Sequence, residues 1–468
     1  MTVPNFVAAL VLIAVLGGVT FAVWRFARQA LRIVVIHNLV WAGAIVLVAS
    51  GLIRYVDSSP AAWLTLLAGL IFFSVGCVGA AWLTARRRHP ADDDESASVP
   101  EPAPLVTRRI LLVLSAIYAA AFTVYLTSVS INYGLFTLLT SPSSIRAEPY
   151  LEAVPLPIRL LLHLGPLLFA VLGFRPAVRV PLPLAWRIVG MALLAVSMLA
   201  LLQRTNLFMA LLLLVALILT QPRDGSSKDN PATTSVRRTP AVRVVASVLA
   251  AALVALVAFQ VLASGLRKQG SQAVSTGAVS EVLESSGLTS AFVYYTAGPV
   301  AFLRIADSTD DNWPPEASGR QLVVGNYNPQ TWGLLTFSVP LRLIPGAPEW
   351  SNSPFVETPV LTNVYTWMEP LYRDFRVAGV IVGMALLGGI LTVLYLKRYR
   401  SPRYYWLQAA ILATVPLATF ASKYNDPLFV FQVLAIVTLT AGSSLKRIRH
   451  RINRRRMTRS RCGETGLQ

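Results

Sequence analysis

The chain has 468 residues, of which 55% are hydrophobic and 13% are charged, and its formal net charge is +19. Soluble globular proteins carry about 25% charged residues, so this composition excludes a soluble enzyme, a disordered chain and a secreted disulfide scaffold. Cys77 and Cys462 lie in unlike surroundings and predict neither a disulfide framework nor a metal cluster. We therefore expect an all-α polytopic integral membrane protein.

Apolar segments long enough to cross a bilayer recur along the chain, and each needs about 20 mostly apolar residues. We predict about 11 transmembrane helices, at residues 5–24, 33–53, 62–84, 109–128, 156–174, 186–202, 205–221, 244–263, 377–396, 405–421 and 428–443. The first follows an uncharged N-terminal flank, which predicts an anchor rather than a cleaved signal peptide. The pair 186–202 and 205–221 could instead form one bent or re-entrant element.

The distribution of Lys and Arg predicts the direction of these helices, because short cytoplasmic loops of membrane proteins are enriched in basic residues. Placing the basic tail in the cytoplasm puts most of the 41 Lys and Arg in inner loops and leaves the outer loops nearly neutral. We expect a multi-pass protein of the cytoplasmic (inner) membrane with its N-terminus outside and its C-terminus in the cytoplasm. The net charge then sets orientation and indicates no nucleic-acid partner.

The predicted spans divide the chain into four parts. They are residues 1–263 with helices one to eight and the polar cytoplasmic linkers 85–108 and 222–243, the large extracytoplasmic loop 264–376, residues 377–443 with helices nine to eleven, and the basic tail 444–468. Loops as long as 264–376 usually carry a role. Within it, 290–305 and 331–344 are apolar but short, so we expect interfacial or re-entrant helices; if both spanned, the total would be 13.

Arginines on the predicted outer side are candidate binding residues. A cation at the membrane boundary costs free energy unless it is paired, solvated or used, and a group of guanidinium ions can neutralise a lipid diphosphate. Each arginine alone is also explained by its side chain reaching the lipid headgroups. The residues in question include Arg146, Arg159, Arg204, Arg267, Arg373 and Arg376.

Aromatic and polar residues add further candidates. Trp332, Trp350 and Trp367 lie in the large loop, where indole rings stack on sugars or form an interfacial belt. His37 with Asn38 in the second span and His163 in the fifth could act as bases, but such residues more often bond across helices. Gly379 and Gly383 form a GxxxG pattern, which predicts a close contact with another helix.

Some signatures are absent from the sequence. No GxxxxGK[ST] motif and no metal-ligand spacing occurs, so we predict neither ATP hydrolysis nor a metal site, and no cofactor. Asp57 is the acidic candidate in the first outer loop, where many lipid-phosphate-sugar transferases carry an aspartate. The spans also lack the charged midplane residues that mark proton-coupled transporters.

One stretch resembles a known family. Residues 363–383, NVYTWMEPLYRDFRVAGVIVG, are similar to the segment after the large periplasmic loop of bacterial oligosaccharide repeat-unit polymerases, the Wzy-type O-antigen polymerases. Their loose pattern is Asn, then Thr three residues later, then a Tyr-x-Asp-Phe-Gly turn that enters a glycine-bearing span. The matching residues are Asn363, Thr366, Tyr372, Asp374, Phe375 and Gly379. Arg376 departs from the pattern, which usually has Gly there.

Weaker similarities occur elsewhere. The run that ends at Arg146 resembles the family's first outer-loop arginine, and Gln203-Arg204-Thr205 resembles its short arginine-bearing turn. Tyr294, Tyr295 and Gly298 resemble an aromatic-glycine helix in the large loop.

The resemblance implies a metal-independent glycosyltransferase. Its substrate would be a polyprenyl-diphosphate-linked oligosaccharide in the membrane lipid, and its partners a chain-length regulator and a flippase. The implied roles are the diphosphate site for Arg146, Arg204 and Arg267 with Arg373 or Arg376, catalysis for Asp374, Glu369 and Arg204, substrate binding for Tyr372, Asn363 and Thr366, and sugar stacking for Trp332, Trp350 and Trp367. Asp374 could instead cap the helix that follows it.

Two other functions stay open. The first is another polyprenyl-phosphate-sugar-dependent membrane transferase or ligase, which would need Asp57 and a metal. The second is a transporter of lipid-linked sugars, which would show symmetry between two halves and a charged midplane cavity.

Overall fold

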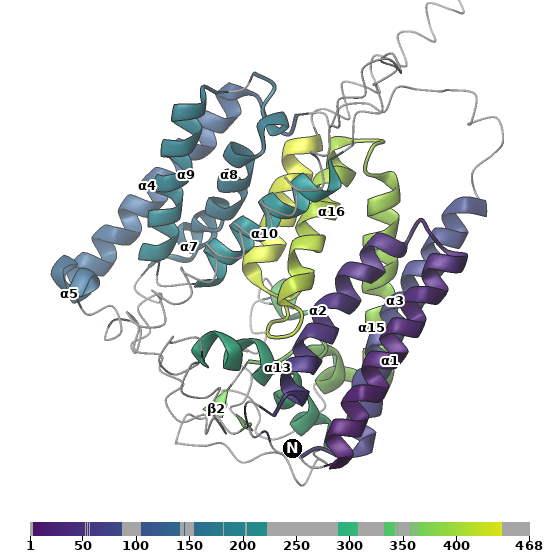
Figure 1. Ribbon diagram of the computed structural model, residues 1–468. Coiled ribbons are helices and arrows are strands. Elements are labelled where there is room, and N and C mark those ends of the chain that lie inside the picture. Colours follow the sequence, from purple (N-terminus) through teal and green to yellow (C-terminus); the bar gives the residue numbers. More distant parts are fainter. Residues whose placement is uncertain are drawn as a thin grey trace, which may run out of the picture.

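The computed structural model describes the chain in stretches. They are residues 3–51, 53, 55, 57–86, 104–140, 145, 154–180, 182–201, 204–221, 289–307, 332–341, 344, 356–358, 361–362 and 364–441. Apart from one pair of two-residue strands, the regular elements of these stretches are helices (Figure 1). The elements are α1 (Val3–Phe26), α2 (Leu31–Ala49), α3 (Pro60–Arg86), α4 (Arg108–Tyr133), α5 (Leu135–Thr140), α7 (Leu156–Leu162), α8 (Leu164–Gly173), η2 (Arg175–Ala177), α9 (Leu184–Ala200), α10 (Arg204–Thr220), α13 (Thr289–Asp307), α14 (Ser338–Leu341), β1 (Val356–Glu357), β2 (Leu361–Thr362), α15 (Glu369–Lys397), α16 (Pro402–Thr414) and η3 (Val415–Leu417), followed by a helix over Pro427–Ala441.

Six helical segments of the described chain are long and apolar enough to cross a membrane. They are Asn5–Phe26, Leu31–Ala49, Pro60–Arg86, Arg108–Tyr133, Leu156–Gly173 and Glu369–Lys397. All six coincide with predicted spans, because runs of Leu, Val, Ile and Ala dominate their sequences. The all-helical membrane class is therefore confirmed at this coarser level.

The predicted number of 11 spans is not confirmed. Three further predicted spans form shorter apolar helices, at Leu184–Ala200, Thr205–Thr220 and Pro427–Ala441. Span 405–421 corresponds to α16 and η3, and 244–263 lies outside the described residues. The segments 186–202 and 205–221 form two separate helices rather than one bent element.

Helices α3 and α15 pack together most closely, and small residues make this possible. A Cβ atom added at Gly76 would lie 1.9 Å from the Ala385 carbonyl oxygen, and one added at Gly388 would lie 2.1 Å from that of Phe73. The Cys77 thiol also donates to the Gly388 carbonyl oxygen at 3.4 Å. Glycine-mediated approach is a common means of helix association in lipid, where hydrophobic burial between helices contributes little.

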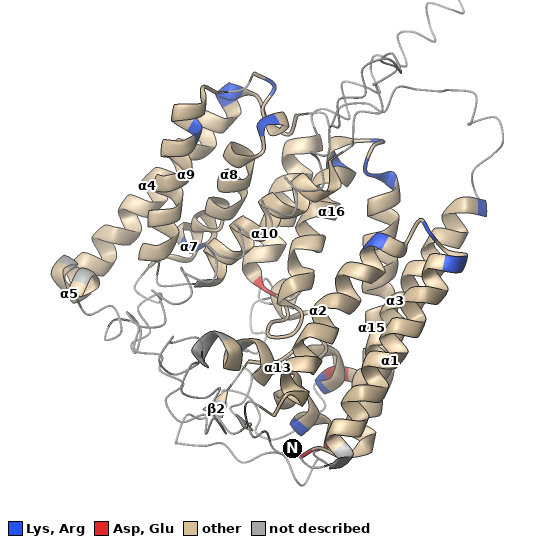
Figure 2. Ribbon diagram, in the orientation of Figure 1, with Lys and Arg blue, Asp and Glu red and all other residues tan. Residues whose placement is uncertain are grey.

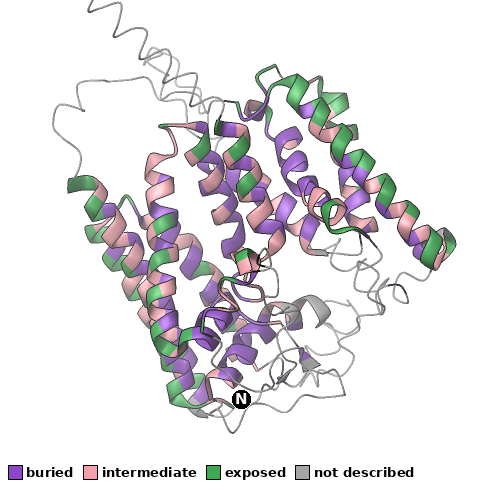
Figure 3. Ribbon diagram, turned by 180° about the vertical axis from the view of Figure 1, so that it is seen from behind, coloured by how far each residue is buried: buried purple, intermediate pink, exposed green. Residues whose placement is uncertain are grey.

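The remaining helices flank this pair (Figure 1). Helices α1 and α2 lie on one side, and α4 with α7 to α10 form a group on the other, to which α16 connects through α10. Exposed residues lie on the outward faces of the outer helices (Figure 3), and many exposed residues of α1, α3, α4 and α9 are large and apolar, as expected where lipid is the solvent.

Helix α13 lies beneath the bundle and corresponds to the predicted interfacial or re-entrant segment 290–305. It packs on α2 and α3, and the Tyr295 hydroxyl donates to the Val40 carbonyl oxygen at 2.7 Å. A Cβ atom at Gly298 would lie 2.0 Å from the Thr419 carbonyl oxygen, so α13 also touches the backbone after η3. The second such segment, 331–344, contains turns at 332–337 and the four-residue α14.

Charge is distributed unevenly along the bundle. Most of the described Lys and Arg gather at the end away from β2 and the N-terminus (Figure 2). They include Arg25, Arg28, Arg86, Arg108, Arg109, Arg175, Arg179, Arg187, Lys397, Arg398, Arg400 and Arg403. We call this the basic end; the opposite end, with α13 and the start of α15, we call the mixed end because acids and arginines occur there together.

Candidate functional site

Residues 364–376 at the mixed end bring together most of the predicted site residues that the structure describes. The Thr366 hydroxyl accepts the Met368 N–H at 3.3 Å and the Thr366 carbonyl accepts the Glu369 N–H at 3.1 Å, which starts α15. Pro370 follows in the first turn, where the missing N–H costs nothing. The Trp367 N–H donates to the Ala418 carbonyl oxygen at 2.9 Å and fixes the segment to the end of η3.

The chain reverses at Arg376, inside α15. Arg376 has φ 57° and ψ −149°, a conformation that favours glycine because a side chain crowds the backbone there. The first turns of α15, Glu369–Phe375, therefore fold back on the span. A Cβ atom at Gly379 would lie 2.3 Å from the Leu371 carbonyl oxygen, and one at Gly383 would meet the Leu371 side chain.

This reversal corrects one prediction. Gly379 and Gly383 were expected to contact another helix, but their close neighbour is Leu371 of the same element. The helix-to-helix contact that glycine permits lies further along α15, at Gly388. The GxxxG spacing thus serves the local fold-back, because only glycine leaves room for Leu371.

Glu369 and Arg373 form a buried ion pair in the folded-back segment. The guanidinium Nη1 lies 3.1 Å from the carboxylate Oε1, and both side chains are less than a tenth exposed. Burial, followed by the negative charge of Glu369, raises the pKa of the nearby Tyr365 hydroxyl well above its usual range. Buried charges at a membrane boundary are costly to keep, which makes this pair a candidate for function.

Asp374 is fully buried and anchors a second segment. Its Oδ1 accepts the Leu335 N–H at 3.2 Å and its Oδ2 accepts the Thr336 N–H at 2.6 Å. The carboxylate therefore binds the turn before α14. Trp332 opens this turn with φ 51° and an indole that is 72% exposed.

A loop that the sequence reading did not single out joins these parts. In residues 422–426, which we call the junction loop, the Tyr424 hydroxyl donates to the Trp367 carbonyl oxygen at 2.9 Å. The Asn425 side-chain amide donates to the Leu335 carbonyl oxygen at 3.0 Å. The available signal was the polar run Lys423-Tyr424-Asn425-Asp426 between two apolar segments on the predicted outer side.

The junction loop also carries a second ion pair, between Lys423 Nζ and Asp426 Oδ2 at 2.5 Å. Asp426 Oδ1 accepts the Leu428 N–H at 2.8 Å and so caps the last helix. Burial alone would raise the pKa of Asp426. The charge and hydrogen bond of Lys423, the Leu428 N–H and the weaker influence of His163 outweigh burial and hold this pKa below its usual range.

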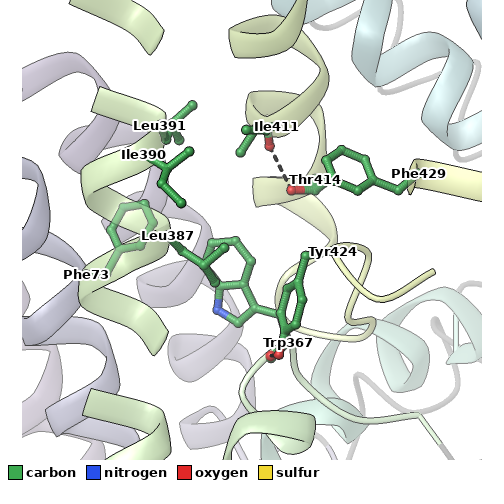
Figure 4. A pocket seen from close by; sticks show the side chains of 9 residues that line it. All are labelled: Phe73, Trp367, Leu387, Ile390, Leu391, Ile411, Thr414, Tyr424 and Phe429. Atoms are coloured by element: carbon green, nitrogen blue, oxygen red, sulfur yellow. Dashed lines mark hydrogen bonds between the residues drawn. The ribbon is translucent and has the colours of Figure 1, made fainter. Parts of the chain in front are cut away.

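An apolar cavity of about 100 Å³ opens beside this polar cluster, between α3, α15, α16 and the last helix (Figure 4). Trp367 and Tyr424 lie at one end of it, and aliphatic side chains of α15 and α16 face each other across it. Its lining is Phe73, Trp367, Leu387, Ile390, Leu391, Ile411, Thr414, Tyr424 and Phe429. The cavity thus connects the candidate site with the interior of the bundle.

The other predicted site residues are placed as follows. The Tyr372 hydroxyl donates to the Ala306 carbonyl oxygen at 3.3 Å, and the Arg376 guanidinium lies 5.7 Å from the centre of the Tyr372 ring. Arg204 begins α10, but its side chain lies outside the described part of the structure. Four further predicted residues, Arg146, Arg267, Trp350 and Asn363, lie wholly outside the described residues.

Two of the remaining polar candidates, His37 and Asp57, bond neighbouring side chains, whereas the buried Nδ1 of His163 has no hydrogen-bond partner among the described residues. His37 Nδ1 lies 2.9 Å from Asn38 Oδ1, and the His37 ring stacks on Phe73 with centroids 3.9 Å apart. His163 stands at the break between α7 and α8. Asp57 Oδ1 accepts a hydrogen bond from the side-chain Nδ2 of Asn5. The Oδ1 of Asn5 in turn accepts the Trp63 indole N–H at 2.9 Å.

Within the described residues, no group of three or more His, Cys, Asp or Glu side chains is arranged to hold a metal ion. No protein-family model, no curated protein and no solved structure matches the chain. The catalytic, diphosphate-binding and sugar-stacking roles given above therefore stay predictions.

Proposed function

We propose that the chain is a membrane glycosyltransferase that polymerises polyprenyl-diphosphate-linked oligosaccharide repeat units into a cell-surface polysaccharide. One observation carries this proposal. Arg376 adopts a backbone conformation that favours glycine, at the one position where the sequence departs from the glycine of the polymerase pattern. The Tyr-x-Asp-Phe-Gly resemblance thus corresponds to a chain reversal, and the match at Tyr372, Asp374 and Gly379 gains physical meaning.

The position of the segment supports a reaction on the outer face of the cytoplasmic membrane. The segment 364–376 lies at the mixed end of the bundle, opposite the basic end (Figure 2). Since basic ends face the cytoplasm in most membrane proteins, the mixed end then faces outward. Lipid-linked sugars on that face would present their diphosphate at this depth.

In the proposed reaction, a hydroxyl oxygen of one lipid-linked repeat unit forms a bond to the anomeric carbon of a growing chain. The bond between that carbon and the diphosphate oxygen breaks, polyprenyl diphosphate leaves with the electron pair, and the hydroxyl proton passes to a base. Arg146, Arg204 and Arg267 are proposed to neutralise the leaving diphosphate. Asp374 and Glu369 are the proposed bases, although both accept bonds within the protein in this conformation.

Lipid-linked oligosaccharides extracted from a deletion strain test the proposal. A polymerase predicts that single repeat units accumulate and that polymer disappears. Loss of one branching sugar would instead identify another polyprenyl-phosphate-sugar transferase, and unchanged glycans would contradict both.

Arg204→Ala, expressed in that strain, tests the arginine assignment. We expect loss of polymer with protein level and topology intact. Arg86→Ala is the matched control, because Arg86 lies at the basic end with its guanidinium 3.6 Å from the Trp82 ring centre. Normal polymer length with Arg204→Ala would contradict the role of Arg204.

A further inference from the structure

The apolar cavity beside Trp367 has the chemistry of a hydrocarbon site. Two of its lining residues carry hydroxyls, and both are satisfied within the protein. Thr414 donates to the Ile411 carbonyl oxygen at 2.7 Å (Figure 4), and Tyr424 donates to the Trp367 carbonyl oxygen. The buried indole N–H of Trp367 is the one polar side-chain group of the lining without a hydrogen-bond partner among the described residues, which is too few to hold a water molecule. Water needs two to four polar partners, so this space favours an apolar guest.

The size of the cavity fits a segment of a chain rather than a whole molecule. Its volume is about 100 Å³, and buried apolar cavities of about 150 Å³ in proteins stay dry and bind guests such as benzene. Four aromatic rings contribute to the lining, from Phe73, Trp367, Tyr424 and Phe429. Such a space admits a few carbons of a branched or unsaturated chain.

The cavity lies next to a surface that faces lipid. Ile390 contributes to its lining and is 51% exposed. Leu386 and Val382 lie one and two turns earlier on α15 and are 59% and 57% exposed, so the three form one exposed apolar stripe. A chain dissolved in the bilayer can therefore reach the cavity along this stripe.

The other end of the cavity lies at the polar cluster. Trp367 lines the cavity and stands two residues before Glu369 of the buried ion pair, and Tyr424 stands beside Lys423. A guest that fills the cavity and ends in a charged headgroup would thus place that headgroup beside the charged residues of the mixed end.

We propose that the cavity between α15, α16 and the last helix holds the part of the polyprenyl chain nearest to the diphosphate, so that Trp367 and Tyr424 position the lipid carrier. This inference rests on the proposed function for the identity of the chain. We expect the cavity to favour the methyl-branched polyprenyl chain over the acyl chains of phospholipids, because a small space lined by four aromatic rings and branched aliphatic side chains suits short branched isoprene units better than long linear chains.

A photoreactive lipid tests the inference on the purified full chain in lipid nanodiscs. The probe is undecaprenyl phosphate with a diazirine in an isoprene unit close to the phosphate, and the comparison is phosphatidylglycerol with a diazirine in an acyl chain. We expect the polyprenyl probe to crosslink to the cavity residues of α15 and α16, mapped by mass spectrometry of peptides. Excess unlabelled undecaprenyl phosphate should abolish these crosslinks, and excess phosphatidylglycerol should not.

Two substitutions sharpen the result. Ile411→Phe fills the cavity and should abolish the polyprenyl crosslinks, whereas Leu193→Phe, on an exposed face of α9 that does not line the cavity, should leave them intact. Equal labelling of the cavity by both probes, or labelling that persists in folded Ile411→Phe, would overturn the inference. If Ile411→Phe fails to fold, the competition on the unaltered chain still decides. Selective labelling together with unchanged glycans in the deletion strain would contradict the proposed polymerase while the lipid site stands.

Discussion

The carboxylate of Asp374 holds the backbone N–H of Thr336 at 2.6 Å, although the two residues are 38 positions apart in the chain. The other carboxylate oxygen accepts the Leu335 N–H, so both oxygens of Asp374 bond the same turn. Both bonds join an ionised acceptor to main-chain donors in a buried setting, where such bonds are strong. Asp374, which is proposed as a catalytic base, is therefore also the residue that holds the turn before α14 in place.

This relationship predicts that Asp374→Ala releases the turn at 332–337. Hydrogen bonds to charged groups are worth about 1.5–3 kcal/mol each, so amides of this turn should exchange with solvent much faster than in the native protein. Hydrogen exchange with peptide readout measures this directly. Asp374→Asn keeps one acceptor oxygen and should show an intermediate effect; unchanged protection in both variants would contradict the anchoring role.

Because Glu369 and Arg373 form a buried ion pair, the effect on stability of substituting one should depend on whether the other is present. Removing one partner leaves a buried charge without its counter-ion, which costs about 3–5 kcal/mol. Glu369→Gln and Arg373→Met should each lower the thermal midpoint substantially. The double variant should be less destabilised than the sum of the two, and strict additivity in this double-mutant cycle would show that the pair contributes no coupling.

Arg376 predicts a stabilising substitution. A non-glycine residue at positive φ destabilises the folded state by about 1–2 kcal/mol. Glycine avoids this cost, although it loses more conformational entropy on folding, which offsets part of the gain. Arg376→Gly should therefore raise the thermal midpoint of the purified protein. Arg376→Ala removes the same guanidinium but keeps a Cβ atom, so it should give no such gain; equal midpoints for the two variants would refute backbone strain as the cause.

The contact between α3 and α15 predicts that a glycine-to-alanine substitution has opposite effects on stability at Gly76 and at Gly79 of α3. A Cβ atom at Gly76 would lie 1.9 Å from the Ala385 carbonyl oxygen, whereas one at Gly79 would meet nothing within 4 Å. Gly76→Ala should force the helices apart and destabilise the fold. Gly79→Ala should be neutral or stabilising by up to about 1 kcal/mol, since alanine favours helix more than glycine. Thermal unfolding in detergent compares the two.

Asp426 predicts a dependence of stability on pH. Its pKa is lower in the folded protein than in the unfolded chain, so the native state binds fewer protons at this site. The stabilisation of the fold by the ionised Asp426 carboxylate is fully present above the usual aspartate pKa of about 4. It is lost as the pH falls through the lower pKa that Asp426 has in the folded protein. The difference in thermal midpoint between the native protein and Asp426→Asn should shrink on acidification below pH 4; a constant difference would contradict the prediction.

Local composition was enough to predict the six described helices that are long and apolar enough to cross a membrane. Residues 62–84 were predicted and α3 runs from Pro60 to Arg86, because a run of apolar residues determines a membrane helix without reference to the rest of the chain. The polar contacts of the site depend on distant segments. No periodic pattern links Asp374 to Thr336, or Tyr424 to the Trp367 carbonyl, which is 57 residues away.

The chain reversal at Arg376 could be predicted only in part, unlike the apolar spans and unlike the contacts between distant segments. The resemblance covers residues 363–383, and its glycine position is the point where the backbone turns. Because arginine is a good helix former, the residue at this position predicts a continuous helix through 376 and not a turn. The glycines at 379 and 383 were recognised, but their partner Leu371 follows only once the reversal is known.

The junction loop 422–426 differs from most short connections between helices. Such connections commonly accept inserted or deleted residues, because few contacts depend on their length. Here Tyr424 contacts the Trp367 carbonyl, Asn425 contacts the Leu335 carbonyl, and Asp426 caps the start of the last helix. A single inserted residue would move Tyr424 and Asn425 out of register with two separate stretches of chain. Length variation between relatives should therefore avoid this loop and collect in the linkers instead.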